Sequence, residues 1–168
     1  MKEVESVKDL GKVNLIGELL EKHYKQQFSD VWNLGLQLAL RITDLLDLKF
    51  SDIKEGRVVI TEGKTGKQAS IILNVKALEL VERMRSENPS HEYMFQSTGR
   101  NVKTVRPITR QAVGQAFKAV GEIIGVHLST HSMRKTRGYH LYQTSNDITK
   151  VMKMLRHSSQ AETLRYIG

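Results

Sequence analysis

The sequence predicts a mainly α-helical domain with one small antiparallel β-sheet, an α+β fold, and three observations support this fold class. Most of the 168 residues fall in segments whose apolar positions recur at helical spacing. Near the middle of the chain, two short segments rich in β-branched residues flank a loop that contains two glycines. The length suits a single domain over residues 1–168, and neither a Pro- or Gly-rich linker nor an internal repeat divides it.

Three helices are expected before the sheet. Apolar residues at helical spacing predict the first helix over residues 10–24. Ser29 is a suitable N-cap for a second helix that continues to Leu40, because a serine hydroxyl can accept a bond from a free backbone N–H group. A short third helix is expected over residues 43–48.

The periodicity then changes from helical to alternating. The segments RVVIT (57–61) and ASIIL (69–73) predict two strands, and EGKTGKQ between them predicts a hairpin loop. Helical patterns return after the second strand. They cover residues 75–85, 109–124, 130–142, 147–155 and 160–166.

The predicted helix 109–124 has two contrasting faces. Val113, Phe117, Val120 and Ile124 form an apolar stripe that should face the core. The opposite face and the segment before the helix carry glutamines and cations, namely Arg100, Lys103, Arg106, Arg110, Gln111, Gln115 and Lys118. Such a surface could contact base edges and phosphates of DNA or be an ordinary solvated face, and the pattern alone leaves both interpretations open.

Composition narrows the functional classes. The chain has 26 Lys and Arg against 18 Asp and Glu, a net charge of +8, which favours a polyanionic partner such as nucleic acid over a membrane surface. The absence of cysteine excludes disulfides, thiolate catalysis and cysteine–zinc sites. No apolar run approaches the roughly 20 residues of a membrane span, and the charged N-terminus lacks the apolar segment of a signal peptide. A cytoplasmic location is therefore expected.

Two motifs suggest sites that the surrounding residues do not support. GKT at 63–65 resembles the end of a phosphate-binding loop, but Val58 occupies the position of the required glycine and a strand follows instead of a helix. His127 and His131 have the spacing of metal ligands on a helix, but the residues between them resemble a helix start and no third ligand is near. Neither a metal nor another cofactor is expected.

A third set of residues fits the cleavage of a phosphodiester without a metal ion. Such a site needs fixed cations around the nonbridging oxygens, a positioned hydroxyl nucleophile and an acid for the leaving oxygen. Arginine suits the first task because its planar fork binds two oxygens and keeps its proton. The chain supplies these groups in the order Arg41, Asp44, Lys64, His131, Arg134, His157 and Tyr166.

These stretches resemble the catalytic domain of tyrosine recombinases, the phage integrase family. The family pattern places an arginine before an acidic–Leu–Leu segment, then a lysine in a β-hairpin, H-x-x-R, His or Trp, and finally Tyr. This sequence carries them in the same order as RITDLLDL, EGKTGK, HSMR and RHSSQAETLRY, and the resemblance spans about residues 10–168. It implies a site-specific recombinase that cleaves and rejoins DNA for integration, excision or inversion.

The resemblance assigns a role to each group. Arg41 and Arg134 should hold the scissile phosphate, and Tyr166 should attack it to give a 3′-phosphotyrosyl link. His131 should accept the tyrosine proton or orient the phosphate, and His157 should donate a hydrogen bond to a nonbridging oxygen. Neither a metal nor a nucleotide enters this chemistry.

The hairpin lysine and an acidic residue complete the implied site. Lys64 should protonate the leaving 5′-oxygen because it stands in the family's K-T-G form, although Lys67 shares its loop and is the alternative. Asp44 should brace the site by holding an arginine. Two positions depart from the family pattern, since Arg156 replaces a usual glycine and Lys135 a frequent histidine.

The family also implies partners. Its helix before H-x-x-R enters the major groove of double-stranded DNA, which favours the DNA-binding interpretation of residues 109–124. A tetramer on DNA and a monomer in its absence are expected. Only forty residues precede Arg41, too few for the N-terminal DNA-clamping domain of most relatives, so that domain is expected to be absent. A type IB topoisomerase and a non-catalytic DNA-binding regulator are the alternative functions.

Overall fold

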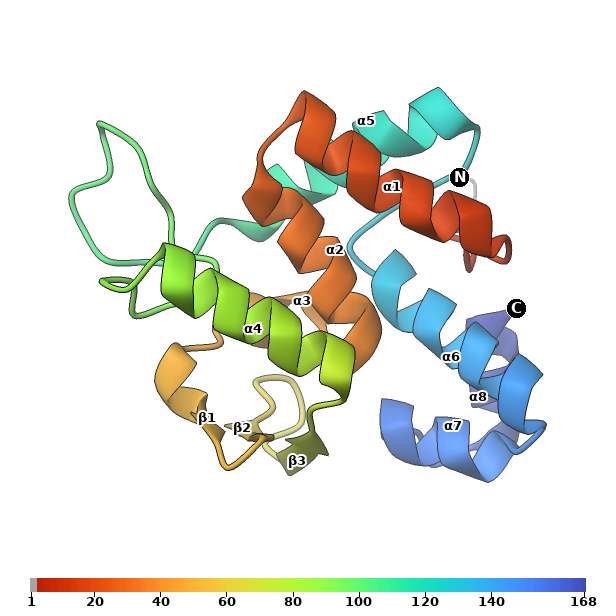
Figure 1. Cartoon of the computed structure of the whole chain (residues 1–168). Coiled ribbons are helices and arrows are strands. Elements are labelled where there is room, and N and C mark those ends of the chain that lie inside the picture. Colours follow the sequence, from red (N-terminus) through yellow and green to blue (C-terminus); the bar gives the residue numbers. More distant parts are fainter. Residues whose placement is uncertain (1–2) are drawn as a thin grey trace.

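The small sheet lies at one edge of a mainly helical molecule (Figure 1), in a computed structural model that describes residues 3–168. In chain order the elements are α1 (Leu10–His23), α2 (Gln26–Leu38), α3 (Ile42–Leu46), a 3₁₀ turn (Phe50–Asp52), β1 (Ile53–Lys54), β2 (Arg57–Thr61), β3 (Gln68–Ile72), α4 (Val75–Glu87), α5 (Arg110–Ile124), α6 (Ser132–Ser145), α7 (Ile148–Leu155) and α8 (Gln160–Ile167). The predicted fold class is confirmed.

The main apolar core joins α1, α2, α4 and α5. Trp32 is fully buried there, its indole N–H donates to the backbone oxygen of Val13 at 3.0 Å, and its ring meets Phe117 edge-on with centroids 5.5 Å apart. Phe117 belongs to the apolar stripe predicted for α5, and Val113 and Val120 of the same stripe are also buried. The packing of this stripe determines which face of α5 remains exposed.

Both boundaries of α2 differ from the prediction. Ser29 does not cap α2, because the helix begins at Gln26 and Ser29 lies buried within it, where its hydroxyl accepts a bond from Asn33 Nδ2 at 3.3 Å. The same helix ends before Leu40, since Ala39 adopts a left-handed conformation with φ of 52°. This turn brings Arg41 to the N-cap of α3.

The sheet has the antiparallel order β1-β2-β3. The hairpin β2–β3 agrees with the prediction, and its register pairs Val58 with Ile71. Strand β1 escaped prediction because it is two residues long. Glu55 and Gly56 join it to β2 with φ of 53° and 73°, the conformation of a two-residue hairpin turn.

The last three helices form a second packing unit, whose first helix, α6, also packs on α2 and contributes Met133 to the main core. Helices α7 and α8 pack on α6 and on each other around Ala39, Val151, Leu155 and Ile167. The N-terminal segment crosses this unit, and the Ser6 hydroxyl donates to the backbone oxygen of Ile167 at 2.6 Å. The segment before α1 therefore lies beside the end of α8 (Figure 1).

None of the helices in residues 3–168 has the length and hydropathy required to span a bilayer.

Candidate active site

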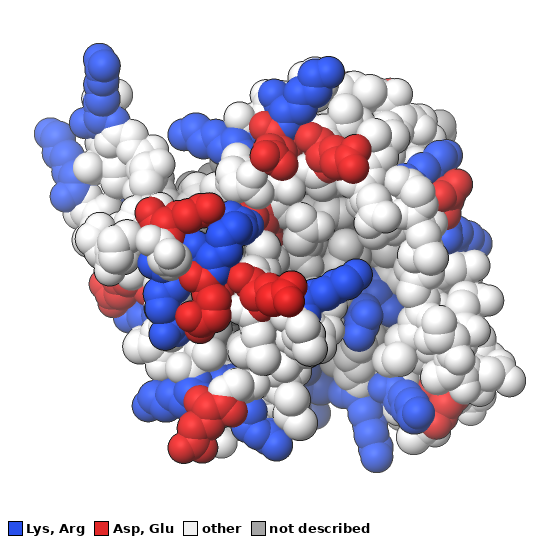
Figure 2. All heavy atoms as spheres, in the orientation of Figure 1, with Lys and Arg blue, Asp and Glu red and all other residues white. Residues whose placement is uncertain are grey.

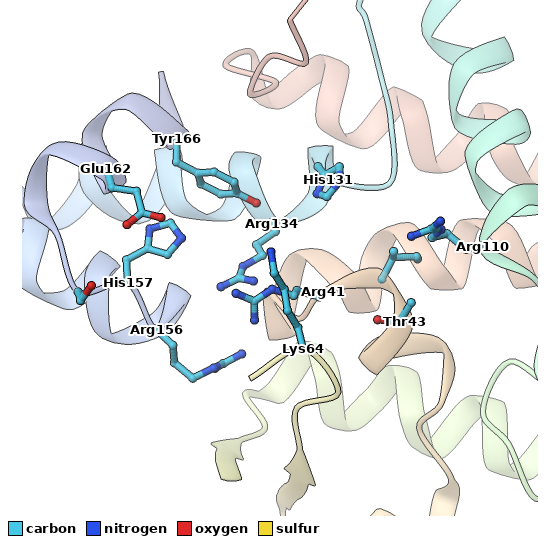
Figure 3. A pocket seen from close by; sticks show the side chains of 12 residues that line it. Arg41, Thr43, Lys64, Arg110, His131, Arg134, Arg156, His157, Glu162 and Tyr166 are labelled. Carbon is cyan, nitrogen blue, oxygen red and sulfur yellow. The ribbon is translucent and has the colours of Figure 1, made fainter. Parts of the chain in front are cut away.

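One cavity of about 460 Å³ collects the side chains that the sequence singled out (Figure 3). Its lining includes all six proposed catalytic residues, Arg41, Lys64, His131, Arg134, His157 and Tyr166. Thr43, Arg110, Arg156, Ser158 and Glu162 also line it. These residues come from the α2–α3 turn, the β2–β3 loop, the start of α5 and the unit α6–α8, so the cavity forms only when distant segments fold together.

Three residues reach the cavity from well-defined helix positions. His131 is the N-cap of α6, which begins at Ser132, two residues after the predicted start, and Arg134 lies in the first turn of the same helix. Tyr166 lies in the last turn of α8, and its ring extends toward Arg134 and His131 (Figure 3). The separation of three between His131 and Arg134 therefore brings both to one end of α6.

Arg134 is the most deeply buried cation of the site, with 4% of its surface exposed. Burial lowers the pKa of Arg134 to about 10, because the charged guanidinium loses hydration, while Tyr166 acts in the opposite direction. The nearby Arg41 and Arg156 add to the lowering. One guanidinium nitrogen donates to the backbone oxygen of Leu155, and Nε has no partner in the described chain. An anion in the cavity would relieve this concentration of positive charge.

Glu62 holds the arginines, a role that the sequence assigned to Asp44. The expectation that Asp44 holds an arginine is wrong, since its Oδ1 accepts from the backbone N–H of Gly63 at 3.0 Å and no arginine forms a hydrogen bond or ion pair with it within residues 3–168. Instead, one oxygen of Glu62 accepts from Arg41 and the other from Arg156. The Glu62 side chain is fully buried.

The alternation of β2 could have pointed to Glu62. Val58 is buried and Ile60 is half-buried on the inner face of the strand. Glu62 follows Ile60 by two positions, so its side chain continues the same face. A carboxylate that continues a buried face requires a partner.

The backbone conformation and the ion pair of Arg156 give a physical reason for its departure from the family pattern. It is the C-cap of α7 and has a φ of 55°, in the left-handed region where glycine is the residue of lowest cost. The ion pair with Glu62 is a contact that glycine could not make at this position.

The two histidines favour the neutral form. Burial lowers the pKa of His131, and the cations Lys135 and Arg110 add to this effect. Burial also lowers the pKa of His157, with Arg134 as the next cause. His157 Nδ1 lies 3.1 Å from the hydroxyl oxygen of Thr163, which itself donates to a backbone oxygen, so Nδ1 is the donor and Nε2 remains for the cavity.

Tyr166 packs between His157 and Lys135. Its ring meets the His157 ring edge-on at 5.1 Å, and Lys135 Nζ lies 5.0 Å from its centroid. Burial raises the pKa of Tyr166, against the lowering effect of Arg134. The hydroxyl is therefore protonated at neutral pH and needs a base to become a nucleophile.

The two hairpin lysines differ in position. Lys64 lies near the tip of the loop and reaches toward Arg41 and Arg134 (Figure 3), whereas Lys67 adjoins β3 and does not line the cavity. This geometry favours Lys64 over Lys67.

The proposed DNA-binding residues lie outside the cavity, except Arg110, which is part of its lining. Lys103, Arg106, Gln111, Gln115 and Lys118 are all exposed. No acidic residue occurs between Glu92 and Glu122. The tip of the loop that precedes α5 accordingly shows basic side chains without acidic ones, whereas α4 carries both signs (Figure 2).

The phage integrase family model matches residues 17–168. The chain belongs to the phage integrase family. A probable integrase/recombinase of Bacillus subtilis, YoeC, is 32% identical over 168 residues, which cover 98% of this chain and 90% of that protein. The tyrosine recombinase XerA of Pyrococcus horikoshii is 25% identical over 131 residues, 76% of this chain and 45% of its own length. The resemblance to tyrosine recombinases is confirmed.

Solved structures of family members share the fold. The crystal structure of XerA recombinase superposes with a TM-score of 0.77 at 15% identity and covers all of this chain and 60% of its own. Lambda integrase, as a tetramer bound to a Holliday junction, gives a TM-score of 0.77 at 20% identity and covers 100% of this chain and 49% of its own. The chain thus spans about half the length of most relatives that it matches, YoeC excepted.

Proposed function

We propose that this chain is the catalytic domain of a site-specific recombinase that cleaves and rejoins double-stranded DNA through a 3′-phosphotyrosyl intermediate. One observation carries the proposal: a tyrosine hydroxyl shares a single cavity with lysine, arginine and histidine side chains in the family's order. The family and its relatives named recombinases support this activity.

In the proposed reaction, the Tyr166 oxygen attacks the scissile phosphorus while the bond from phosphorus to the 5′-oxygen breaks. His131 accepts the phenolic proton, a role that suits it because its lowered pKa keeps the imidazole neutral at pH 7. Lys64 gives a proton to the leaving 5′-oxygen. Attack by a 5′-hydroxyl on the phosphotyrosyl ester reverses these steps and rejoins DNA, so no nucleotide is consumed.

The cations act on the charge that develops on the phosphate. Arg41 and Arg134 donate to the nonbridging oxygens, and His157 adds a bond from Nε2 when it is protonated. Fixed donors of this kind stabilise the transition state because they need no reorganisation during the reaction. The basic loop before α5, which carries Arg100, Lys103 and Arg106, and the exposed face of α5 would contact the adjoining duplex.

The assembly is proposed by extension from relatives. Because lambda integrase is seen as a tetramer on a Holliday junction, we extend a DNA-bound tetramer to this chain and expect a monomer without DNA. A cytoplasmic location follows from action on DNA.

A covalent trapping experiment tests the function. Wild-type protein is incubated in EDTA with nicked duplexes of randomised central sequence, and SDS-resistant protein–DNA adducts are isolated and sequenced. Wild-type protein should form adducts, and Tyr166→Phe should form none while binding DNA within about twofold of wild type, because only the nucleophilic oxygen is lost. Adducts in the phenylalanine variant would show that another residue is the nucleophile.

A further inference from the structure

Glu62 and Arg156 join the two sides of the cavity. Arg156 stands at the end of α7, directly before His157, and its side chain extends toward the hairpin loop that carries Lys64 (Figure 3). Its Nε donates to Glu62 Oε1 at the base of that loop. Helices α7 and α8 otherwise pack on α6 and on each other, so this ion pair connects their unit to the hairpin directly.

Glu62 also closes the hairpin loop through hydrogen bonds of its own backbone groups. Its N–H donates to the backbone oxygen of Lys67 at 2.8 Å, and its own backbone oxygen accepts from Gly66 at 2.8 Å. These two bonds close the loop over residues 62–67, with Lys64 inside it. A movement of the Glu62 side chain would therefore shift the loop and the Lys64 ammonium relative to the arginines.

The carboxylate of Glu62 is held in place by two ion pairs. Its carboxylate is fully buried and faces two guanidinium groups, Arg41 and Arg156. Without Arg156, the carboxylate would retain a single cation and one oxygen would lose its donor. A buried carboxylate with an unpaired oxygen is destabilised, and the loop could relax to bring that oxygen to water.

We propose that Arg156 is a positioning residue that, through Glu62, places Lys64 for protonation of the leaving oxygen. This role rests on the proposed recombinase function and extends it to a residue that replaces the usual glycine of the family. Arg156 has a left-handed backbone conformation, which glycine would adopt at a lower conformational free energy. The presence of arginine at this position is consistent with a role for its side chain.

Strand cleavage of a sequence recovered from the trapping experiment tests the role of Arg156. Arg156→Gln should slow adduct formation on ordinary DNA by on the order of 10- to 100-fold, as expected when a catalytic group is displaced by about 1 Å. On DNA with a 5′-bridging phosphorothiolate, where the leaving sulfur needs no proton, the loss should be less than about threefold. Arg156→Lys, which can keep the ion pair, should recover most of the rate.

Two further variants separate positioning from folding. Arg156→Gly relieves the left-handed backbone, which offsets part of the cost of losing the ion pair, so it should lose less thermal stability than Arg156→Gln and still show the selective loss on ordinary DNA. In a Lys64→Ala background, Arg156→Gln should cause no further loss, because the group that it positions is absent. Equal slowing on both DNA types would assign Arg156 to another role and overturn the proposal.

Hydrogen exchange in the free protein tests the same coupling without any catalysis. Arg156→Gln should increase amide exchange at Glu62, Gly63 and Gly66, whose N–H groups anchor the loop, by about tenfold or more. Lys153→Gln is the matched control, because it removes a cation from the exposed side of α7 and should leave these amides unchanged. Unchanged amide exchange of the loop in Arg156→Gln would refute the coupling between Arg156 and the loop, whether or not the wild-type protein forms adducts. Absence of adducts with the wild-type protein would refute the recombinase function and leave the coupling to be judged by the exchange measurement.

Discussion

Lys64 and Lys67 occupy the same hairpin loop, but they differ in what they can reach. Lys64 lines the cavity beside Arg41 and Arg134, while Lys67 uses its backbone to close the loop with Glu62. A general acid must lie within hydrogen-bond reach of the leaving oxygen, so the cavity position is decisive.

Lys64→Ala should therefore slow cleavage of ordinary DNA by about 100-fold or more, the range for loss of a general acid. On a 5′-bridging phosphorothiolate the same variant should cleave at nearly the wild-type rate, because sulfur leaves without a proton. Rates of adduct formation on paired substrates measure this difference. If Lys67→Ala showed the selective rescue instead, the acid would be Lys67.

The histidines also predict how stability depends on pH. Burial lowers the pKa of both His131 and His157 in the folded state, whereas an unfolded histidine titrates near 6.5. The unfolded chain thus binds more protons below that pH. The stability that they contribute is present above pH 6.5 and is lost as pH falls through the folded values.

Thermal unfolding between pH 7.5 and 5 measures this effect. The melting temperature of wild type should fall with pH, and the variant His131→Gln/His157→Gln should lose less over the same interval. His127→Gln is the control, because His127 is exposed in the loop before α6. If the melting temperature fell equally with pH in the double variant and in wild type, burial of these histidines would have no effect on the free energy of unfolding.

At the scale of elements, α5 is a helix with two contrasting faces, and a separate task is proposed for each. Its apolar stripe is buried against Trp32, which leaves Gln111 and Gln115 exposed next to the basic loop. Glutamine can read adenine by a bidentate contact, whereas lysine and arginine on the loop contact phosphates of any sequence.

Substitutions on α5 and its loop should accordingly differ in kind. Gln111→Ala or Gln115→Ala should lower the preference for a specific over a scrambled duplex by roughly 1–3 kcal/mol. Lys103→Ala should weaken binding to both duplexes alike. Competition titrations distinguish the two patterns, and equal losses for the glutamine variants on both duplexes would exclude α5 as the reading helix.

Elements with caps and a clear period could be predicted from the sequence, and elements set by tertiary contacts could not. The helices predicted over 109–124 and 147–155 are confirmed as α5 and α7, and the first residue of each predicted range, Thr109 or Asp147, is the N-cap. Ser29 was misassigned because a serine inside a helix and a capping serine have the same local signature. Glu62 was missed because its role depends on Arg41 and Arg156, which lie 21 and 94 residues away in sequence.

At the scale of the whole molecule, the cavity lies where two packing units meet. Arg41 and Lys64 belong to the unit of the main core, and Arg134 and Tyr166 belong to the unit α6–α8. The reacting groups therefore depend on how these units are held together. An ion pair across the cavity, such as that of Glu62 with Arg156, is therefore expected to influence the proposed reaction without touching the phosphate.

The charge of the whole chain gives the last prediction. A net charge of +8, with a stretch free of acids between Glu92 and Glu122, implies that phosphate contacts dominate DNA affinity. If about six phosphates are neutralised, log K should fall with log salt at a slope of about −5. Binding titrations from 50 to 200 mM salt, concentrations over which counterion release is usually resolved, measure this slope. Lys103→Ala or Arg106→Ala should each flatten it by about one, and Gln115→Ala should leave it unchanged because an amide displaces no counterion. A slope that stayed the same in both cationic variants would place the DNA on another surface of the molecule.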